Sequence, residues 1–290
     1  KIVWYENSPD TPPTTPTGLS ATPSDAQVVL TWTANSESDF SYYNVYGGTS
    51  ASPTTLLSTV TAGTETYTHT GLTNGTTYYY RISAVDDSGN ESDETSDVSA
   101  TPAYQGPSWH VSTTGSDDND GSEGSPFATI YAGLDAASSG DSVIVASGEY
   151  IMDQNTLVSE GIILKLEPGV TLKFDADKSI LVQGELNAQG TVDNQILFTS
   201  NQSSPSPGDW YGLSFSTSLT PASFVNGEYA SGSIIEYCTI EYGTELYAYG
   251  GFPFFNHSTI QYMSEEAIGG DYTASADLVV TNCNFYYNNK

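Results

Sequence analysis

Three segments in the C-terminal third of the chain repeat one pattern: IEYCTIEY at residues 235–242, FNHSTIQY at 255–262 and VTNCNFYY at 280–287. Corresponding positions are 20 residues apart between the first two segments and 25 apart between the last two. A period of this length is typical of one coil in a solenoid, where each coil packs on its neighbours. The repeat therefore predicts a stack of β-strand coils.

Apolar and polar residues alternate within the segments, which predicts the side chains that point inward. Successive side chains of a strand point to opposite faces of the sheet, so equivalent apolar positions should form columns inside the stack. The expected inward columns are Ile235, Phe255 and Val280; Cys238, Ser258 and Cys283; and Ile240, Ile260 and Phe285, with Tyr237, His257 and Asn282 at a tight corner between two strands.

The two cysteines of the chain fall in one of these columns, two coils apart. Two strand spacings of about 4.8 Å each exceed the ~7 Å between Cα atoms that a disulfide tolerates. We therefore predict that Cys238 and Cys283 are free, buried thiols.

Upstream of the repeat lies the one convincing helical pattern, PFATIYAGLDAA at residues 126–137. Pro126 stands at the expected first helical position, and apolar residues follow on one stripe. A strand at 109–112 and an acidic loop precede this helix, and the strand GDSVIV follows at 140–145. This order resembles the N-terminal capping segment of right-handed parallel β-helix proteins of the pectin-lyase-like superfamily. The resemblance implies a right-handed parallel β-helix over residues 109–290 with one N-terminal capping helix, truncated at its C-terminal end.

The N-terminal part of the chain has short alternating strands between turn residues, with the clearest strands expected at 28–32, 42–46, 66–69 and 77–85. The segments PTGL at 16–19, LTW at 30–32 and GLTNGTTY at 71–78 resemble a fibronectin type III domain, with Trp32 in its core and Tyr78 in a tyrosine corner. The resemblance implies a β-sandwich over residues 14–103, so the whole chain is expected to be all-β. Residues 104–108 are then a linker, and 1–13 the tail of a preceding domain with its own linker.

The charge balance excludes several partners. Lys and Arg number 6 against 35 Asp and Glu, a formal net charge of −29. Nucleic acid is not expected because its phosphates would be repelled, and acidic polysaccharides are disfavoured unless divalent cations bridge. No apolar run of about 18 residues is present to span a membrane. We expect a fragment of a large, secreted, multidomain bacterial protein, extracellular or at the cell surface, with further domains at both ends.

Catalytic residues have only weak candidates. The resemblance implies that a lyase would use an Arg or Lys base, but the expected β-helix has no Arg, and Lys165 and Lys173 occupy solvent-facing strand positions. The hydrolase motifs of the superfamily are also absent. Glu236 and Glu241 could converge around their shared corner with His257 on the next coil, and glycoside hydrolysis needs two carboxylates at a defined separation. The alternative is that all three are solvated surface residues.

Two further groups of residues are candidates for ligand binding. Aromatic rings stack on the apolar faces of sugars, and the tyrosines favoured for sugar contact are Tyr242, Tyr247, Tyr249 and Tyr262. Carboxylate and amide oxygens next to a Gly turn suit Ca²⁺, and the residues expected to hold a structural calcium ion that pins the cap are Asp117, Asp118, Asn119, Asp120 and Glu123. An acidic turn without metal is the alternative for this loop.

These observations favour a non-catalytic adhesion or scaffold segment that could bind polysaccharide on the β-helix surface. The alternative is a polysaccharide-degrading enzyme, a lyase or a glycoside hydrolase. A third hypothesis is purely structural assembly through an open end of the solenoid.

Overall fold

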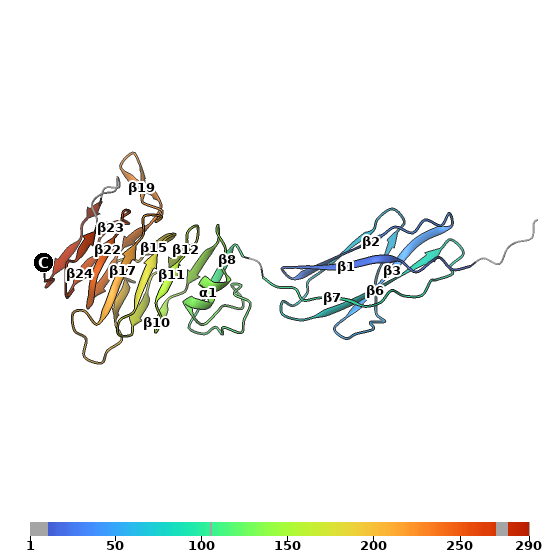
Figure 1. The fold of residues 1–290 in the computed structure, drawn as a ribbon, viewed down its shortest axis with the longest axis horizontal. Coiled ribbons are helices and arrows are strands. Elements are labelled where there is room, and N and C mark those ends of the chain that lie inside the picture. Colours follow the sequence, from blue (N-terminus) through green and yellow to red (C-terminus); the bar gives the residue numbers. More distant parts are fainter. Residues whose placement is uncertain (1–10, 105, 271–277, 290) are drawn as a thin grey trace, which may run out of the picture. The chain divides into compact units, whose positions relative to one another are not determined.

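The computed structural model describes residues 11–104, 106–270 and 278–289, which divide into two compact units, 1–105 and 106–290 (Figure 1). Residues 1–10, where the tail of a preceding domain is expected, lie outside the described residues. No helix in the described part of the chain is long and apolar enough to cross a membrane.

The first unit is a sandwich of two antiparallel sheets. One sheet contains β1 (Thr17–Ser24), β2 (Gln27–Thr33) and β5 (Thr66–Thr70). The other contains β4 (Leu56–Thr61), β3 (Phe40–Gly48), β6 (Tyr78–Asp86) and β7 (Val98–Ala100). The four strands expected from the sequence are all present.

Two aromatic features hold this sandwich together, and both were expected. Trp32 is buried between the sheets and meets the ring of Tyr43 edge-on, with the ring centroids 5.1 Å apart. The Tyr78 hydroxyl accepts a hydrogen bond from the Thr73 backbone N–H at 3.1 Å, which is the tyrosine corner.

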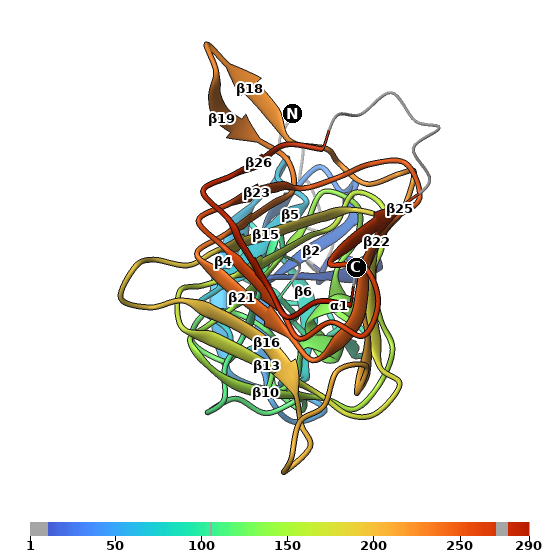
Figure 2. The same cartoon turned by 90° about the vertical axis from the view of Figure 1, so that its left-hand side faces the viewer.

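The second unit is built from three parallel sheets that form the walls of a coil (Figure 2). Sheet 1 contains β8 (Ser108–Val111), β9 (Ser142–Val145), β12 (Ile163–Leu166), β15 (Glu185–Gln189), β20 (Ile234–Glu236), β23 (Phe254–Asn256) and β26 (Val280–Thr281). Sheet 2 contains β10 (Gly148–Met152), β13 (Val170–Phe174), β16 (Ile196–Ser200), β21 (Cys238–Glu241), β24 (Thr259–Gln261) and β27 (Asn284–Tyr286). Sheet 3 contains β11 (Thr156–Val158), β14 (Ser179–Val182), β17 (Trp210–Phe215), β22 (Gly243–Ala248) and β25 (Ile268–Gly270).

From β9 onward the chain visits sheets 1, 2 and 3 in turn, so each set of three strands completes one coil of a parallel β-helix. The repeat read from the sequence has the right register: Ile235 pairs with Phe255 and Phe255 with Val280, while Ile240 pairs with Ile260 and Ile260 with Phe285. The first two coils are similar in length, because Ser142 pairs with Ile163 and Ile163 with Glu185, which are 21 and 22 residues apart. The fold class is thus all-β, as expected.

The inward columns are buried except in the last described coil. Ile240 and Ile260 are fully buried, whereas Phe285 is 44% exposed because no described strand stacks beyond β27. The end of the described stack also explains why the two cysteines differ in burial. Both are free, as expected, and Cys238 is buried, but Cys283 is only partly buried and corrects that half of the prediction.

The corners of the coil use residues in the left-handed region, which is uncommon for residues other than glycine. Tyr237, His257 and Asn282, expected at a corner, have φ of 49°, 47° and 54°. A second set, missed in the sequence, is formed by Tyr242, Tyr262 and Tyr287 with φ of 62°, 56° and 54°. One left-handed residue turns the chain from one sheet to the next, and repetition of the turn in the last three described coils aligns the side chains in ladders.

The capping helix begins later than expected. The helix α1 spans Ile130–Ala136, and its N-cap is Thr129, whose hydroxyl accepts from the Ala132 N–H at 3.2 Å. Pro126 therefore lies before the helix and not at its first position. The reason is that a threonine hydroxyl satisfies one of the free N–H groups of the first turn, which the Pro126 side chain cannot do.

Candidate functional site

One coil of the β-helix is much longer than the others. Asn187 in β15 pairs with Ile234 in β20, so this coil takes 47 residues where the next, from Ile234 to Phe254, takes 20. The extra length includes a hairpin of β18 (Ser223–Val225) and β19 (Glu228–Ser231), which protrudes beside sheet 1 (Figure 2). Its two turn residues, Asn226 and Gly227, both have positive φ, as the tightest hairpin turns require.

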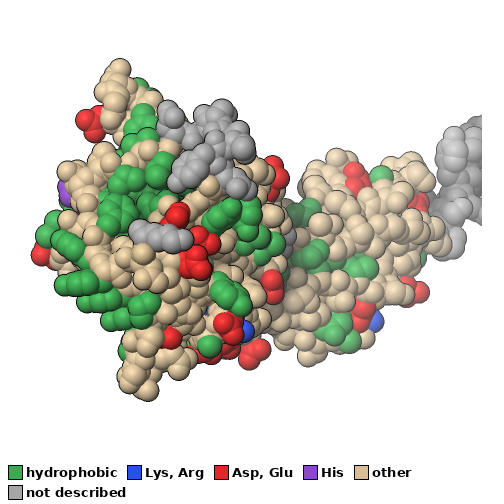
Figure 3. All heavy atoms as spheres, turned by 60° about the vertical axis from the view of Figure 1, so that its left-hand side comes forward, with side chains coloured by type: hydrophobic (Ala, Val, Ile, Leu, Met, Phe, Trp, Pro, Cys, Tyr) green, Lys and Arg blue, Asp and Glu red, His purple; other side chains and the backbone are tan. Residues whose placement is uncertain are grey.

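The hairpin covers apolar side chains on the outer face of sheet 1. Ile235 and Phe255 point inward, so their neighbours Ile234 and Phe254 point outward, yet these are only 1% and 8% exposed. Phe224 meets Phe254 edge-on with centroids 5.2 Å apart. The ring of Tyr229 in β19 stacks on that of Phe254 at 6.1 Å. On the face shown in Figure 3, hydrophobic side chains gather at the base of the hairpin.

A cavity of about 330 Å³ lies between the hairpin and sheet 1, and we call it the hairpin cavity. Its apolar wall contains Phe224, Tyr229, Ile234 and Phe254, its polar floor contains Glu236, Asn256, Thr281 and Asn282, and Gly227 and Glu228 lie at the turn of the hairpin. Binding sites for small polar molecules combine an apolar wall with a few oriented polar groups in this way.

The floor is a hydrogen-bonded row that ends on one carboxylate. Glu236 accepts from Asn256 Nδ2 at 2.6 Å and from Gln189 Nε2 at 3.1 Å. Asn256 Oδ1 in turn accepts from Thr281 Oγ1 at 2.7 Å and from Asn282 Nδ2 at 3.1 Å. Because the Asn256 amide is used at both ends, its orientation is determined, and the floor places oriented amide groups beside the Glu236 carboxylate.

The cavity has a negative electrostatic environment. Burial raises the pKa of Tyr229 to about 12, and the carboxylates of Glu185 and Glu236 contribute to that rise. Burial also raises the pKa of Glu185. Tyr229 is therefore neutral at physiological pH, and its hydroxyl donates to the Gly232 carbonyl at 2.6 Å.

The structure separates the three weak catalytic candidates. Glu236 lies in the floor of the hairpin cavity, but Glu241 belongs to sheet 2, where it accepts from Gln261 Nε2 at 2.7 Å and Thr199 Oγ1 at 3.0 Å. His257 stands at its corner, stacked on Tyr237 with centroids 4.7 Å apart. Each glutamate thus belongs to a different polar ladder, and among the described residues no hydrogen bond or ion pair joins the His257 side chain to either.

The four tyrosines expected to contact sugar lie outside the hairpin cavity. Tyr262 is sandwiched between Tyr242 at 5.2 Å and Tyr287 at 5.1 Å, so both faces of its ring are covered. Tyr247 and Tyr249 meet edge-on at the end of β22. The sequence interpretation did not select Phe224, Tyr229 or Phe254. The available signal was the long interval between two coils together with the Asn-Gly turn.

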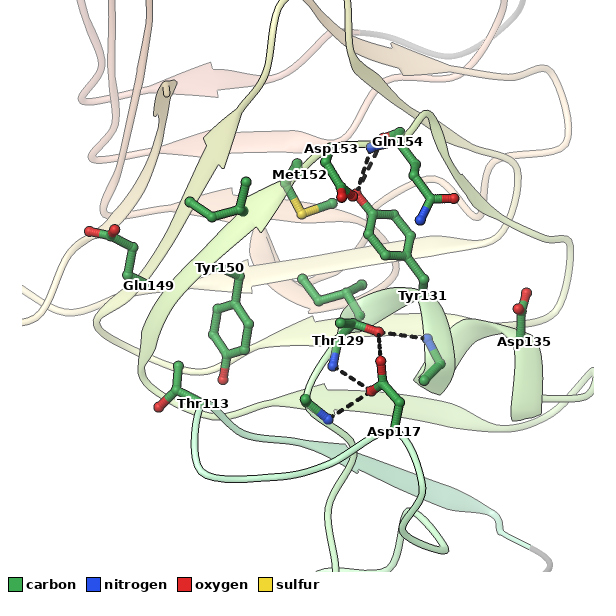
Figure 4. Close-up of a pocket in the computed structure, with 14 residues that line it drawn as sticks. Thr113, Asp117, Thr129, Tyr131, Asp135, Glu149, Tyr150, Met152, Asp153 and Gln154 are labelled. Carbon is green, nitrogen blue, oxygen red and sulfur yellow. Dashed lines mark hydrogen bonds between the residues drawn. The ribbon is translucent and has the colours of Figure 1, made fainter. Parts of the chain in front are cut away.

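Two carboxylates of the expected calcium loop, those of Asp117 and Asp120, accept hydrogen bonds from protein groups, and Figure 4 shows the partners of Asp117. Asp117 accepts hydrogen bonds at 2.9 Å from the N–H groups of Ala128 and Thr129 and from the Thr129 hydroxyl, and so anchors the start of α1. Asp120 accepts from Ser122, and Asn119 donates to the Pro126 carbonyl. Asp118 is exposed, and Glu123 lies further along the loop. Among the described residues, no three His, Cys, Asp or Glu side chains form a group suited to a metal ion, and calcium here stays a prediction.

A second hollow, of about 560 Å³, lies beside this anchor between α1 and β10. Figure 4 shows Tyr131 on one side of it and Tyr150 on the other. The Tyr131 hydroxyl is hydrogen-bonded to the backbone of Gln154. Its acidic side chains are spread around the rim, and Glu149 is paired with Lys173 at 2.7 Å. This hollow is therefore a weaker candidate than the hairpin cavity.

Comparison with known families matches both parts of the chain. Residues 12–101 match the family described as Fibronectin type III domain, and residues 136–277 match the Pectate-lyase like beta helix domain. Exoglucanase B of Cellulomonas fimi is 36% identical over 127 residues, covering 38% of this chain and 11% of that protein. Amylopullulanase of Thermoanaerobacterium saccharolyticum is 40% identical over 100 residues, covering 32% of this chain and 7% of that protein.

Among solved structures, an Fn3-like protein from Clostridium thermocellum is 32% identical with a TM-score of 0.27, covering 32% of this chain and 95% of that one. A β-1,2-glucanase from Parabacteroides distasonis is 24% identical with a TM-score of 0.29, covering 32% of this chain and 14% of that one. The chain thus spans about a tenth or less of the length of the curated relatives that it matches.

Proposed function

We propose that this chain, in which a fibronectin type III domain is followed by a pectate-lyase-like β-helix domain, is a non-catalytic segment of an extracellular protein that binds polysaccharide in the hairpin cavity. The observation that carries the proposal is the meeting of an aromatic wall with an oriented polar floor in that cavity.

The cavity offers the two interactions that sugars need. A pyranose ring has an apolar face, which stacks on aromatic rings, and an edge of hydroxyl groups, which need both donors and acceptors. Phe224 keeps part of its ring exposed beside Tyr229. The floor supplies the Glu236 carboxylate as acceptor and the amide of Asn282 as donor, held by neighbours from successive coils.

A non-catalytic role agrees with the way the glutamates are used. Both oxygens of Glu236, and both of Glu241, already accept hydrogen bonds from ladder side chains on neighbouring coils. The amide donors fix Glu236 as a hydrogen-bond acceptor, a role it can also have toward ligand hydroxyl groups, whereas a general acid must donate a proton to the substrate. We assign the first domain the role of a spacer. The whole segment is then extracellular or at the cell surface, where it serves adhesion or forms part of a larger polysaccharide-processing protein. The relatives named exoglucanase and amylopullulanase agree with the latter setting.

Affinity electrophoresis in gels that contain soluble polysaccharides tests the proposal. Phe224→Ala removes an exposed part of the aromatic wall, and we expect it to weaken binding by a factor of about 2 to 10, since aromatic contacts contribute about 0.5–1.5 kcal/mol beyond the area they bury. The matched control is Tyr211→Ala, because Tyr211 is 57% exposed on β17 and does not line the cavity. If Phe224→Ala binds as tightly as the unaltered chain, the hairpin cavity is not the site.

One observation favours the alternative of a glycoside hydrolase. Burial raises the pKa of Glu185, and its carboxylate and that of Glu236 both act on Tyr229, so two carboxyl groups lie near one cavity. A reducing-sugar assay on the polysaccharides that bind separates the two functions. Turnover that Glu236→Gln or Glu185→Gln abolishes would replace the binding role with the hydrolase.

A further inference from the structure

Lysine and arginine are missing from the stretch of sequence that builds the hairpin cavity. Between Lys178 and Lys290 the chain has eleven Asp and Glu residues and no Lys or Arg. Of the lysines on earlier coils, Lys165 pairs with Glu167 and Lys173 with Glu149, each at 2.7 Å. Lys178, which borders the stretch, does not line the cavity. The described residues that line the cavity include Glu228 and Glu236 and no cationic side chain.

The surroundings of Tyr229 agree with this count of charges. Besides burial, the charges of Glu185 and Glu236 hold its hydroxyl in the neutral form. A ligand carboxylate placed against the same ring would meet the same repulsion. A carboxylate of a sugar acid is normally balanced by Arg, Lys or a bound cation, and the described lining provides neither of the two side chains.

We infer that the hairpin cavity selects uncharged polysaccharides and rejects polyuronates, which rests on the proposed binding function. The floor fits this class because its remaining hydrogen-bonding capacity suits hydroxyl groups. Glu236 can accept further O–H donors beside its two amide partners, and Asn282 has a second N–H beyond the one given to Asn256. Hydroxyl groups satisfy such a floor without adding charge.

The expected discrimination follows from Coulomb's law. A ligand carboxylate at about 7 Å from one glutamate is disfavoured by a factor of about 3 at an effective dielectric constant of 80 and by about 50 at 20. Two glutamates line the cavity, so we expect a carboxylated polymer to bind at least about tenfold more weakly at low salt. The Debye length falls from about 10 Å at 0.1 M to about 3 Å at 1 M, so the difference should shrink in concentrated salt.

The test compares hydroxyethylcellulose, barley β-glucan and soluble starch with the same polymers after oxidation of their primary alcohols to carboxylates. Dissociation constants of the full chain are measured at low salt and at about 1 M NaCl, with EDTA and with calcium. Phe224→Ala reports whether binding occurs in the hairpin cavity. The double substitution Glu228→Gln with Glu236→Gln removes the two lining charges at nearly constant size.

The inference is supported if a neutral polymer binds, its carboxylated form binds at least tenfold more weakly, and the ratio falls several-fold at high salt and in the double variant. Equal or tighter binding of the carboxylated form at a site sensitive to Phe224→Ala, with or without calcium, overturns the inference and leaves the binding function standing. If none of the six polymers binds, the proposed function fails and the inference fails with it.

Discussion

The left-handed tyrosine at the corner between sheets 2 and 3 allows a direct test of how the coil is stabilised. Tyr262 has φ of 56°, and its ring lies between those of Tyr242 and Tyr287. Its backbone N–H donates to the Tyr286 carbonyl on the next coil at 3.2 Å. The residue thus combines a backbone cost with a stacking gain, and substitutions by Gly and Ala separate the two.

The magnitudes follow from these contacts. Either substitution removes two ring stacks, each contributing about 0.5–1.5 kcal/mol, so both should lower the free energy of unfolding by about 1–3 kcal/mol. The left-handed conformation costs a residue with a Cβ atom about 1–2 kcal/mol, and Gly avoids this cost. Gly also loses about 0.5–1 kcal/mol more in chain entropy on folding than Ala does. Tyr262→Gly should therefore be less destabilising than Tyr262→Ala by about 0.5–1 kcal/mol.

Thiol reactivity can follow this unfolding in the second unit alone. Both cysteines of the chain lie in the β-helix, so in a Cys283→Ser background Cys238 is the one thiol. It is fully buried, and burial raises its pKa far above the ordinary value, which keeps it unreactive until the coil opens. Labelling at equilibrium in urea gives the midpoint, and the two Tyr262 variants should differ by about 0.2–1 M.

A matched pair at Tyr211 provides the control. Tyr211 is exposed on strand β17 and is not among the residues with positive φ. At this position Gly should be more destabilising than Ala, by about 0.5–1 kcal/mol. The reasoning is refuted if Tyr262→Ala is as stable as Tyr262→Gly, or if the order at Tyr262 matches the order at Tyr211.

Three further predictions concern the sandwich and the cap. Tyr78→Phe removes the acceptor for the Thr73 N–H and should cost the first unit about 0.5–1.5 kcal/mol in urea denaturation; an unchanged midpoint would contradict the tyrosine corner. The Thr14 hydroxyl and N–H lower the pKa of Glu37 from 4.5 to about 2, so this stabilisation is complete above pH ~4.5 and is lost as the pH falls toward 2; Glu37→Gln should flatten that part of the stability profile, and identical acid titrations would exclude the effect. Calcium at 100 times its dissociation constant should stabilise the β-helix by about 2.7 kcal/mol; Asp118→Asn should abolish the shift, and equal midpoints in calcium and EDTA would refute calcium binding in this loop.

The register of the β-helix could be predicted because a coil interacts mainly with its neighbours. Once IEYCTIEY is aligned with FNHSTIQY, the pairs Ile235–Phe255 and Ile240–Ile260 follow from strand alternation alone. The polar ladders could also be derived, since Glu236 lies opposite Asn256 and Glu241 opposite Gln261. In both cases the partner of a residue is set by a constant offset along the chain.

The left-handed tyrosines between sheets 2 and 3 show what could not be predicted from the residue spacing. Residue spacing placed Tyr242 and Tyr262 at equivalent positions but did not reveal that each turns the chain with a positive φ. In that conformation the two rings stack on each other with their centroids 5.2 Å apart, so the face that each ring turns to the other is covered. The mutual covering of side chains depends on backbone angles that the sequence pattern does not specify.

Sequence alone therefore determined the two domains, the coil period, the inward columns, the free thiols and the negative charge. Only the tertiary structure decided the candidate site, because the hairpin comes from an irregular insertion with no equivalent in the other coils as far as the structure describes them. Its docking on Ile234 and Phe254 creates the cavity and brings Phe224 and Tyr229 over Glu236. Contacts that repeat at a fixed period can be read from spacing, whereas a contact made once, by a segment that leaves the coil and returns, depends on the path of that segment through space.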